Sequence, residues 1–289
     1  MEKIIVEFWY VLVLIAAVLH SIWNFMLKRS ENKQIFLWSL LLWSIIIFLP
    51  ISIYFWPNTI SIKHLVFWGV GSAIIHSIYS LFLIKAYEKS DFTVAYPIAR
   101  GTGSLIVIII GITILKEDVE IITILGTLLI IFGIYILYSG LNLRNGIKTF
   151  NVIKDSPWPV LVGITIASYT IFDKLAVSFI PPIILYVIEN IGQAIVLGSS
   201  IHKQGKKTIY EQWRKHWYKM ALAGLFAGLA YILVLIVLTE IPVSYVSPIR
   251  ETSIVIGSVI GFVFLKEKFS IQKLFGSIVI FIGVVLIIT

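Results

Sequence analysis

The feature that most constrains this chain is a series of apolar blocks of about 20 residues, almost free of charge. An α-helix needs about 20 residues, at 1.5 Å each, to cross the roughly 30 Å hydrocarbon core of a bilayer. The sequence has ten such blocks, at 5–27, 34–56, 65–86, 92–115, 121–139, 158–178, 181–201, 217–239, 243–265 and 271–288. We therefore expect an all-α membrane protein with ten transmembrane helices, in which 140–157 and 202–216 are the longest connections.

The composition agrees with a chain that lies mostly inside a bilayer. Hydrophobic residues make up 59% of the 289 residues and charged residues only 13%, about half the charged share of a soluble domain. So few polar side chains could not cover a water-facing fold of this size. The first block ends in Lys28 and Arg29 rather than at a small-residue cleavage site, so we expect it to be a span. The lack of cysteine excludes disulfides and cysteine nucleophiles.

The net charge of +8 is explained by topology rather than by nucleic-acid binding. Most of the 23 Lys and Arg residues lie in connections that follow odd-numbered spans, and the sequence has no basic domain to hold a nucleic acid. Ten spans place both termini on one side of the membrane. The positive-inside rule, applied to these connections, would make that side external.

The second half of the sequence repeats the first. At an offset of 150 the matching pairs are Arg100 and Arg250, Thr102 and Thr252, Glu117 and Glu267, Gly126 and Gly276, and Gly133 and Gly283. Near the first and sixth spans the offset is 146, and Lys28 faces Lys174. Each half holds five spans, an odd number, so the second copy enters the membrane from the opposite side. We expect two inverted five-helix repeats, at 1–139 and 158–289, joined by an interfacial linker at 140–157.

These features resemble the drug/metabolite transporter superfamily, and in particular its ten-span EamA branch. The motifs that carry the resemblance are His20-Ser-Ile-Trp23-Asn24, Ala95-Tyr96-Pro97-Ile-Ala-Arg100-Gly101, Leu115-Lys116-Glu117, Tyr169-Thr170-Ile-Phe-Asp173-Lys174 and Pro248-Ile-Arg250-Glu251. The resemblance implies a secondary carrier of small metabolites with a central cavity between the repeats. It also implies cytoplasmic termini, opposite to the charge distribution, so the side on which the termini lie stays open.

Arg100 and Arg250 lie well inside the fourth and ninth predicted spans. A charge at mid-membrane costs about 2.5–3.5 kcal/mol on insertion scales, so such residues face a wet cavity or a partner. A guanidinium forms two parallel hydrogen bonds with a carboxylate or phosphate, and one hypothesis is that an arginine binds an acidic group of the substrate. The alternative is an internal ion pair with Glu189 or Glu251.

Two further features concern helix ends and breaks. Pro97 and Pro248 each precede one of the arginines by two or three residues. Because proline removes a backbone donor, the sequence predicts a weakened helix beside each charge. Glu117 and Glu267 follow Leu-Lys at span ends, and we interpret them as anchors at helix starts rather than as substrate ligands.

Glu189 is an isolated carboxylate in the seventh predicted span, and Gln193 follows on the same helix face. A carboxyl group in an apolar span that takes up and releases a proton suits proton coupling. The alternative is that Glu189 is a static partner for an arginine. We propose Glu189 as the proton-coupling residue.

Polar stripes at helical spacing mark three other spans, and they must face the bundle rather than lipid. Their function is cavity lining or helix-to-helix hydrogen bonding. The resulting substrate-binding candidates are His20, Trp23, Asn24, His76, Tyr79, Tyr96, Arg100, Tyr169, Glu189, Gln193 and Arg250. Asp173 and Lys174 form either an ion pair at a helix end or a gate. Two histidines without a nearby carboxylate motif make a poor metal site, so we expect no metal.

The sequence lacks a P-loop, an H-E-x-x-H motif and a G-x-S-x-G motif, so we expect neither a cofactor nor an enzyme. We expect a secondary active transporter of a small polar or charged metabolite, amino-acid-like or organic-anion-like, that works by alternating access. Its partners would be this substrate, protons and the lipid of a bacterial or archaeal plasma membrane, and it would be a monomer or a homodimer. The alternatives are a lipid-linked substrate carrier or flippase and an intramembrane enzyme.

Overall fold

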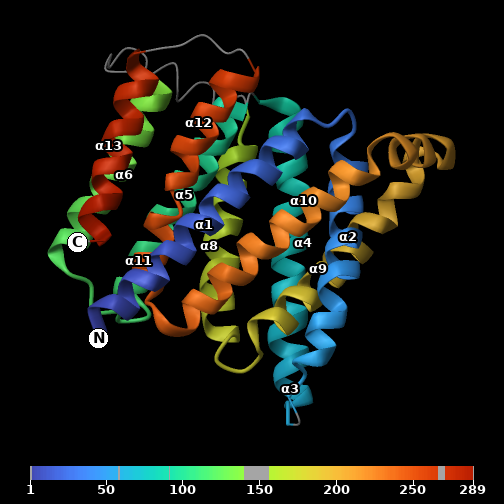
Figure 1. Ribbon diagram of the computed structural model, residues 1–289, viewed down its shortest axis with the longest axis horizontal. Helices are drawn as coiled ribbons and strands as arrows, with labels where there is room; N and C mark the ends of the chain where they lie inside the picture. Colours follow the sequence, from blue (N-terminus) through green and yellow to red (C-terminus); the bar gives the residue numbers. More distant parts are fainter. Residues whose placement is uncertain (1, 58, 91, 140–155, 266–270, 289) are drawn as a thin grey trace.

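The computed structural model describes residues 2–57, 59–90, 92–139, 156–265 and 271–288, and every element in these ranges is a helix (Figure 1). The first half consists of α1 (Glu2–Arg29), α2 (Lys33–Tyr54), α3 (Ile62–His64), the π-helix η1 (Leu65–Val70), α4 (Gly71–Lys89), α5 (Phe92–Thr113) and α6 (Ile121–Ser139). The second half consists of α8 (Trp158–Ala176), α9 (Pro182–Ile201), the 3₁₀-helix η2 (His202–Gln204), α10 (Lys206–Glu240), α11 (Val243–Ile249), α12 (Thr252–Leu265) and α13 (Ile271–Ile288). The predicted linker lies, up to residue 155, outside the described residues.

Six helical segments of the described chain are long and apolar enough to cross a membrane. They are Glu7–Arg29, Lys33–Tyr54, Ile62–Lys89, Trp158–Ala176, Pro182–Gln204 and Lys206–Glu240. Shorter apolar segments lie in α5, α6 and α13. The predicted all-α, multi-pass membrane fold is therefore confirmed. The predicted number of ten spans is not confirmed, because only six segments of the described chain are long enough.

The predicted span 243–265 is wrong as a single helix, because α11 ends at Ile249 and α12 begins at Thr252. Arg250 and Glu251 lie in the break. There the N–H of Glu251 donates to the carbonyl oxygen three residues earlier at 2.9 Å, a tighter turn than that of an α-helix. The weakening predicted beside Pro248 is therefore found in the second half.

The first half lacks the corresponding break. α5 continues as a helix from Phe92 to Thr113, through Pro97, so the helix is not broken in this segment. The two halves, which match in sequence around their arginines, thus differ in backbone structure at this position.

The predicted connection 202–216 is also wrong, because α10 begins at Lys206 and is 35 residues long. Gly205, with φ of 81°, turns the chain just before it, in a conformation that glycine adopts without a Cβ clash. The first turns of α10 are rich in basic and aromatic residues. Low hydropathy hid this helical segment from a search for apolar blocks.

The helices of the two halves pack in corresponding pairs. α6 packs along α13 and α2 packs against α9, each helix against its own equivalent in the other repeat (Figure 1). In the repeat, α1 is equivalent to α8, α4 to α10 and α5 to α12. The contact between α5 and α8 therefore corresponds to the contact between α12 and α1, and the contact between α1 and α10 corresponds to the contact between α8 and α4. This exchange of equivalent neighbours is the pattern of two repeats related by a pseudo-two-fold axis.

The glycines of the repeat make the closest contact between α6 and α13. A Cβ added to Gly126 would lie 2.6 Å from the carbonyl oxygen of Gly283, and one added to Gly133 would lie 2.8 Å from that of Gly276. Gly126 is equivalent to Gly276, and Gly133 to Gly283, so the two contacts exchange under the repeat. The two helices therefore cross antiparallel, with the pseudo-two-fold axis perpendicular to both.

Lys28 and Lys174, which match in the repeat, have the same structural role. The Nζ atom of Lys28 donates to two carbonyl oxygens at the end of α4, at 2.9 and 2.8 Å. The Nζ atom of Lys174 donates to two carbonyl oxygens at the end of α10, at 2.7 and 3.2 Å. A cation on the last carbonyls stabilises a helix end. Lys174 therefore caps a helix, and Asp173 has other partners.

Glu117 binds a helix start, as the sequence predicts. Its two carboxylate oxygens accept hydrogen bonds from the N–H groups of Val243 and Ser244, at 2.8 and 2.9 Å, at the beginning of α11. A carboxylate on these free donors stabilises the N-terminus of the helix. The equivalent residue, Glu267, lies outside the described residues.

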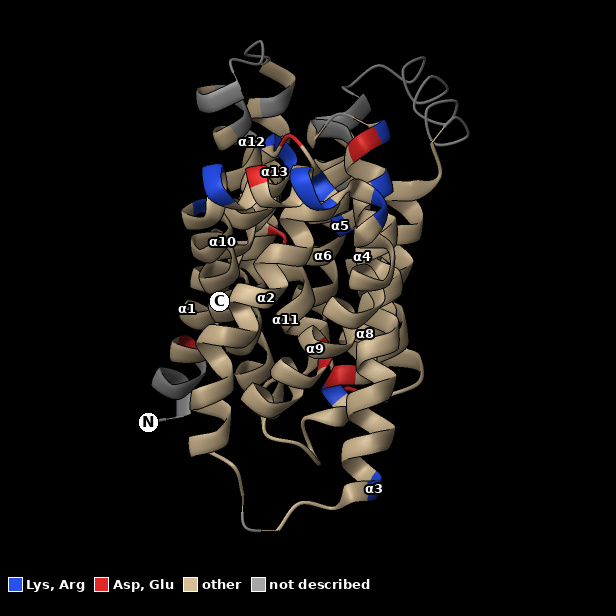
Figure 2. Cartoon of the chain, turned by 90° about the vertical axis from the view of Figure 1, so that its right-hand side faces the viewer, with Lys and Arg blue, Asp and Glu red and all other residues tan. Residues whose placement is uncertain are grey.

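Lys and Arg gather at one end of the bundle, where α1 ends and α10 begins (Figure 2). The segment around α3 lies at the opposite end (Figure 2). The described basic residues at the end of α1 and the start of α10 therefore share one end of the bundle.

Candidate functional site

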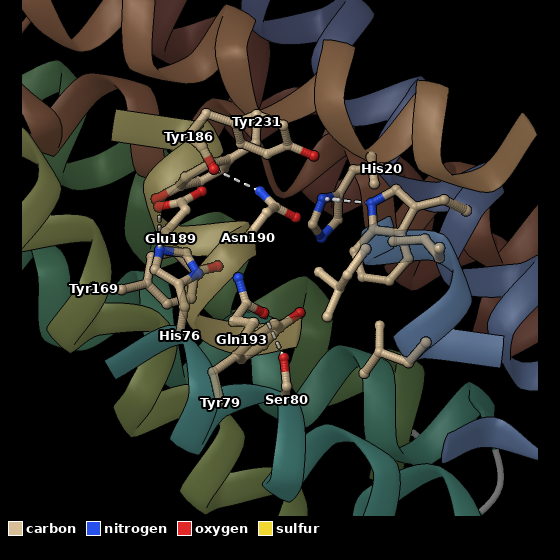
Figure 3. A pocket seen from close by; sticks show the side chains of 15 residues that line it. His20, His76, Tyr79, Ser80, Tyr169, Tyr186, Glu189, Asn190, Gln193 and Tyr231 are labelled. Atoms are coloured by element: carbon tan, nitrogen blue, oxygen red, sulfur yellow. Dashed lines mark hydrogen bonds and ion pairs between the residues drawn. The ribbon is translucent and has the colours of Figure 1, made fainter. Parts of the chain in front are cut away.

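A pocket lies between α1, α2, α4, α8, α9 and α10, so helices from both halves enclose it (Figure 3). Its volume is about 60 Å³, which is room for a few water molecules. Most of the predicted candidates line it, namely His20, Trp23, His76, Tyr79, Tyr169, Glu189 and Gln193. The structure thus brings to one place residues that are up to about 170 positions apart in the sequence.

A buried cluster of polar side chains lies beside this pocket, and three of its members, His76, Glu189 and Tyr231, line it. Nε2 of His76 lies 2.9 Å from Oδ2 of Asp173 and 3.1 Å from Oε2 of Glu189. Ser72 donates from its hydroxyl to Oδ1 of Asp173 at 2.6 Å and to Oε2 of Glu189 at 3.2 Å, and Tyr231 donates to Oδ2 of Asp173. Asp173 and Glu189 are at most 1% exposed. We call His76, Asp173 and Glu189 the triad.

The π-helix η1 and a glycine place α4 against α8 at this cluster. The wide turn of η1 ends at Val70, just before Gly71 and Ser72, and so sets the rotation of the following helix. A Cβ on Gly71 would lie 2.5 Å from the ring of Phe172, so a larger residue here would displace this ring. Ser72 and His76 then face Asp173 across the contact.

Aromatic rings surround the triad and form much of the pocket wall. The His76 and Tyr169 rings are stacked with centroids 4.2 Å apart, and Tyr79 and Tyr231 meet the Tyr169 ring edge-on at 5.3 and 5.7 Å. On α1, Nε1 of Trp23 donates to Nδ1 of His20 at 3.2 Å. These contacts fix the rings in place, so the pocket has a defined shape.

Two amide side chains on α9 complete the polar lining. Asn190 and Gln193 point into the pocket (Figure 3). Oε1 of Gln193 accepts a hydrogen bond from Ser80 at 2.6 Å, and Nδ2 of Asn190 donates to the carbonyl oxygen of Tyr186 at 2.7 Å. The prediction that Glu189 and Gln193 share one helix face is confirmed by their common place in the pocket wall.

Arg100 and Arg250 do not line this pocket. Nη2 of Arg100 lies 3.1 Å from Oε1 of Glu251, and the two side chains are only 3% and 2% exposed. The internal ion pair considered for Arg100 is thus present. Within the described residues, Nε of Arg100 and Oε2 of Glu251 have no hydrogen-bond partner. The Arg250 guanidinium lies 6.0 Å from the ring centroid of Tyr231.

Asn24 and Tyr96 also lie outside the pocket wall. Nδ2 of Asn24 donates to the carbonyl oxygen of His20 at 2.9 Å, and its Oδ1 accepts a hydrogen bond from Tyr87 at 2.7 Å. The ring of Tyr96 stacks on Phe92 at 4.9 Å. In this structure both side chains connect buried parts of the bundle.

The reason given for expecting no metal is wrong for His76, since two carboxylates lie within 3.1 Å of its ring. Asp173 was assigned to a helix end, and its fully buried place beside α4 follows only from the packing of α8. Tyr231 was missed as well. Its only sequence signal is a tyrosine in a long apolar stretch of α10.

A helical bundle of two repeats around a buried polar pocket, with helices long enough to span a bilayer, is an architecture that many membrane transport proteins have. The chain belongs to the EamA-like transporter family, whose sequence profile matches residues 7–139 and 157–289. It is therefore a multi-pass membrane transporter of the drug/metabolite transporter type. A comparison with curated proteins finds no match.

Solved structures also match this chain. One of them, described only as the crystal structure of a protein, is 12% identical, with a TM-score of 0.69. The match covers 99% of this chain and 98% of the other. At this identity the similarity concerns the fold alone.

Proposed function

We propose that the protein is a secondary active transporter that moves a small, amino-acid-like metabolite with a cationic amine by alternating access. In this proposal the chain has ten spans in two inverted five-helix repeats, with α11 and α12 together as the ninth span. It lies in the plasma membrane of a bacterium or archaeon. The supporting observation is the pocket between helices of both repeats, with His76 and Glu189 of the triad in its wall. One chain encloses the pocket, so a monomer suffices for transport.

The charges around the pocket favour an amine over an organic anion as the recognised group. Glu189 lines the pocket, whereas Arg100 is outside its wall and already paired with Glu251. The faces of Trp23, Tyr79 and Tyr169 add to this preference, because aromatic rings attract cations. The amides of Asn190 and Gln193 offer hydrogen bonds to the remaining polar groups of such a substrate.

Proton coupling follows from the balance of buried charge. Among the described residues, the buried Asp, Glu, Lys and Arg side chains are two arginines, Arg100 and Arg250, and three carboxylates, Asp173, Glu189 and Glu251. With all five ionised and His76 neutral, one negative charge is in excess. An uncompensated charge in the interior is costly. We assign the compensating positive charge to a proton on the triad when no substrate is bound, and to the amine of the substrate when it is bound.

Alternating access is supported by the relation between the repeats. A pseudo-two-fold pair can exchange the arrangements of its two halves, which moves the opening of a central pocket from one face to the other. The break at Arg250 and Glu251 is a natural hinge, because helix ends absorb changes in backbone angles. The Glu117 contact would keep the start of α11 in place as the hinge moves.

The first test is a thermal-shift screen of the purified protein against amino acids, polyamines, organic acids, sugars and nucleotides. A ligand that binds only the folded state raises the melting temperature. We expect stabilisation by an amine-containing compound. Stabilisation by organic acids or sugars alone would contradict the proposed substrate class.

The second test is transport of the compound so identified in proteoliposomes under an imposed pH gradient. The gradient should drive accumulation by the wild type, and Glu189→Gln should lose this response while keeping passive exchange. Glu31→Gln, which removes an exposed carboxylate outside the pocket, is the matched control and should behave as the wild type. An unchanged pH response in Glu189→Gln would refute its role.

A further inference from the structure

Beyond metabolite transport, we infer that His76, Asp173 and Glu189 form a binding site for a divalent transition-metal cation of the Zn²⁺ class. The triad offers one imidazole nitrogen and two carboxylate oxygens, which lie within 4.8 Å of one another. Imidazole and carboxylate together are typical ligands of Zn²⁺, Co²⁺ and Mn²⁺. Three different helices, α4, α8 and α9, supply the three ligands.

The distances within the triad fit such an ion. A metal about 2.0–2.2 Å from each ligand separates neighbouring ligand atoms by roughly 2.8–3.6 Å, depending on its coordination geometry. Nε2 of His76 is already 2.9 Å from the Asp173 oxygen and 3.1 Å from the Glu189 oxygen. An ion would enter between the imidazole and the two carboxylates, whose ligand atoms all lie within 4.8 Å of one another.

Neighbouring groups hold the ligands in orientation. Ser72 donates to the Oδ1 atom of Asp173 and Tyr231 donates to its Oδ2 atom, so the carboxylate cannot rotate freely. The imidazole of His76 is held by stacking on Tyr169. Such outer contacts raise metal affinity, because they reduce the freedom that the ligands lose on binding.

The charge and the shape of the site also fit a divalent cation. Among the described ion pairs, no Lys or Arg lies within 4.0 Å of Asp173 or Glu189, so no cationic side chain competes with an ion for these two carboxylates. His76 and Glu189 both line the pocket. The ion would therefore have three protein ligands and an open position facing the pocket, the arrangement of sites that exchange water or bind a further ligand.

The test is direct titration of the tag-free, metal-free, full-length protein with Co²⁺ and Zn²⁺. Co²⁺ bound by nitrogen and oxygen ligands gives visible absorption bands, and the chain has no cysteine to supply other ligands. We expect one Co²⁺ per chain, displaced by Zn²⁺, and a Zn²⁺-dependent rise in melting temperature. Binding should strengthen from pH 6 to pH 8, because the metal displaces protons.

The variants His76→Gln and Glu189→Gln should each weaken Co²⁺ binding at least about tenfold. The matched control is His216→Gln, since His216 is also close to a carboxylate, 3.8 Å from Glu31, but outside the triad. It should bind as the wild type does. If one variant fails to fold, as judged by size-exclusion chromatography, the other still decides the question.

Absence of stoichiometric Co²⁺ binding, or a loss of binding in His216→Gln and not in the triad variants, would overturn the inference. Transport measured in the presence of a chelator separates this inference from the proposed function. Intact proton-coupled transport without metal binding would remove the metal site alone. Metal binding without any transport would remove the transporter proposal and leave the site.

Discussion

The Arg100–Glu251 ion pair allows a quantitative test of how much a buried ion pair contributes to the unfolding free energy of this bundle. The charged atoms are 3.1 Å apart, and the side chains are 3% and 2% exposed. At an effective dielectric constant of about 20, their attraction is about 5 kcal/mol. Arg100→Gln leaves the Glu251 carboxylate buried without its partner, and Glu251→Gln leaves the guanidinium. We expect each single variant to lose about 3–5 kcal/mol of unfolding free energy.

The double variant Arg100→Gln/Glu251→Gln removes both charges and should be much less damaging than the two single losses added together. Replacing both members of a buried pair with neutral groups is often nearly neutral, because the desolvation cost disappears with the attraction. We expect the double variant to lose no more than about 2 kcal/mol, where additivity would predict roughly 6–10 kcal/mol. Unfolding is measured in mixed micelles by fluorescence of the nine tryptophans.

Additivity of the two single variants within about 0.5 kcal/mol would show that the two charges do not interact, and would refute this reasoning. The matched control is the exposed pair of Lys215 and Glu31, whose charged atoms are 2.9 Å apart, with side chains 64% and 57% exposed. Neutralising both of these residues should leave the unfolding free energy nearly unchanged, because exposed ion pairs contribute little. The contrast tests whether burial, rather than distance, sets the effect.

Three further predictions follow from single features. Gly126→Ala should lower stability by about 1–3 kcal/mol in the same unfolding assay, because the new Cβ would lie 2.6 Å from the Gly283 carbonyl oxygen. Hydrogen bonds from neighbouring side chains lower the pKa of Glu31 to about 2, so its stabilising effect is full above its usual pKa of 4.5 and is lost only as the pH falls toward 2. Because Glu31 is exposed, melting temperatures of the wild type and Glu31→Gln should differ by only a small, constant amount between pH 5 and 8 and converge below pH 4. The positive-inside rule predicts that the basic end of the bundle faces the cytoplasm, in which case an impermeant maleimide added to intact cells labels Ser61→Cys and spares Lys207→Cys; the opposite labelling would support the cytoplasmic termini that the family resemblance implies.

The sequence was most informative where one physical constraint dominates. The thickness of the bilayer sets the length of an apolar block, so helices such as α2 and α9 match their predicted ranges within a few residues. The duplicated glycines marked the repeat in the sequence, and the structure shows that they lie in the contact between α6 and α13. Glu117 was predicted at a helix start because it follows Leu-Lys at a span end.

The remaining features depend on interactions that a one-dimensional pattern does not contain. The break in the ninth span and the continuity of α5 both follow a proline, so proline alone does not decide between them. The triad requires that α8 and α9 bring Asp173 and Glu189 against α4. Nothing in the spacing of these residues along the chain fixes that convergence.

The buried carboxylates belong to one repeat, and the basic side chains that contact them belong to the other. Asp173, Glu189 and Glu251 all belong to the second repeat, whereas His76 and Arg100, which contact them, belong to the first. Movement of one repeat against the other therefore changes every one of these contacts at once. In the proposed transport, a proton or an amine that arrives at the triad would alter the attraction between the repeats, and so the relative stability of their two arrangements. This link between bound charge and repeat packing is what coupled transport requires, because a ligand shifts a conformational equilibrium only by binding the two states differently.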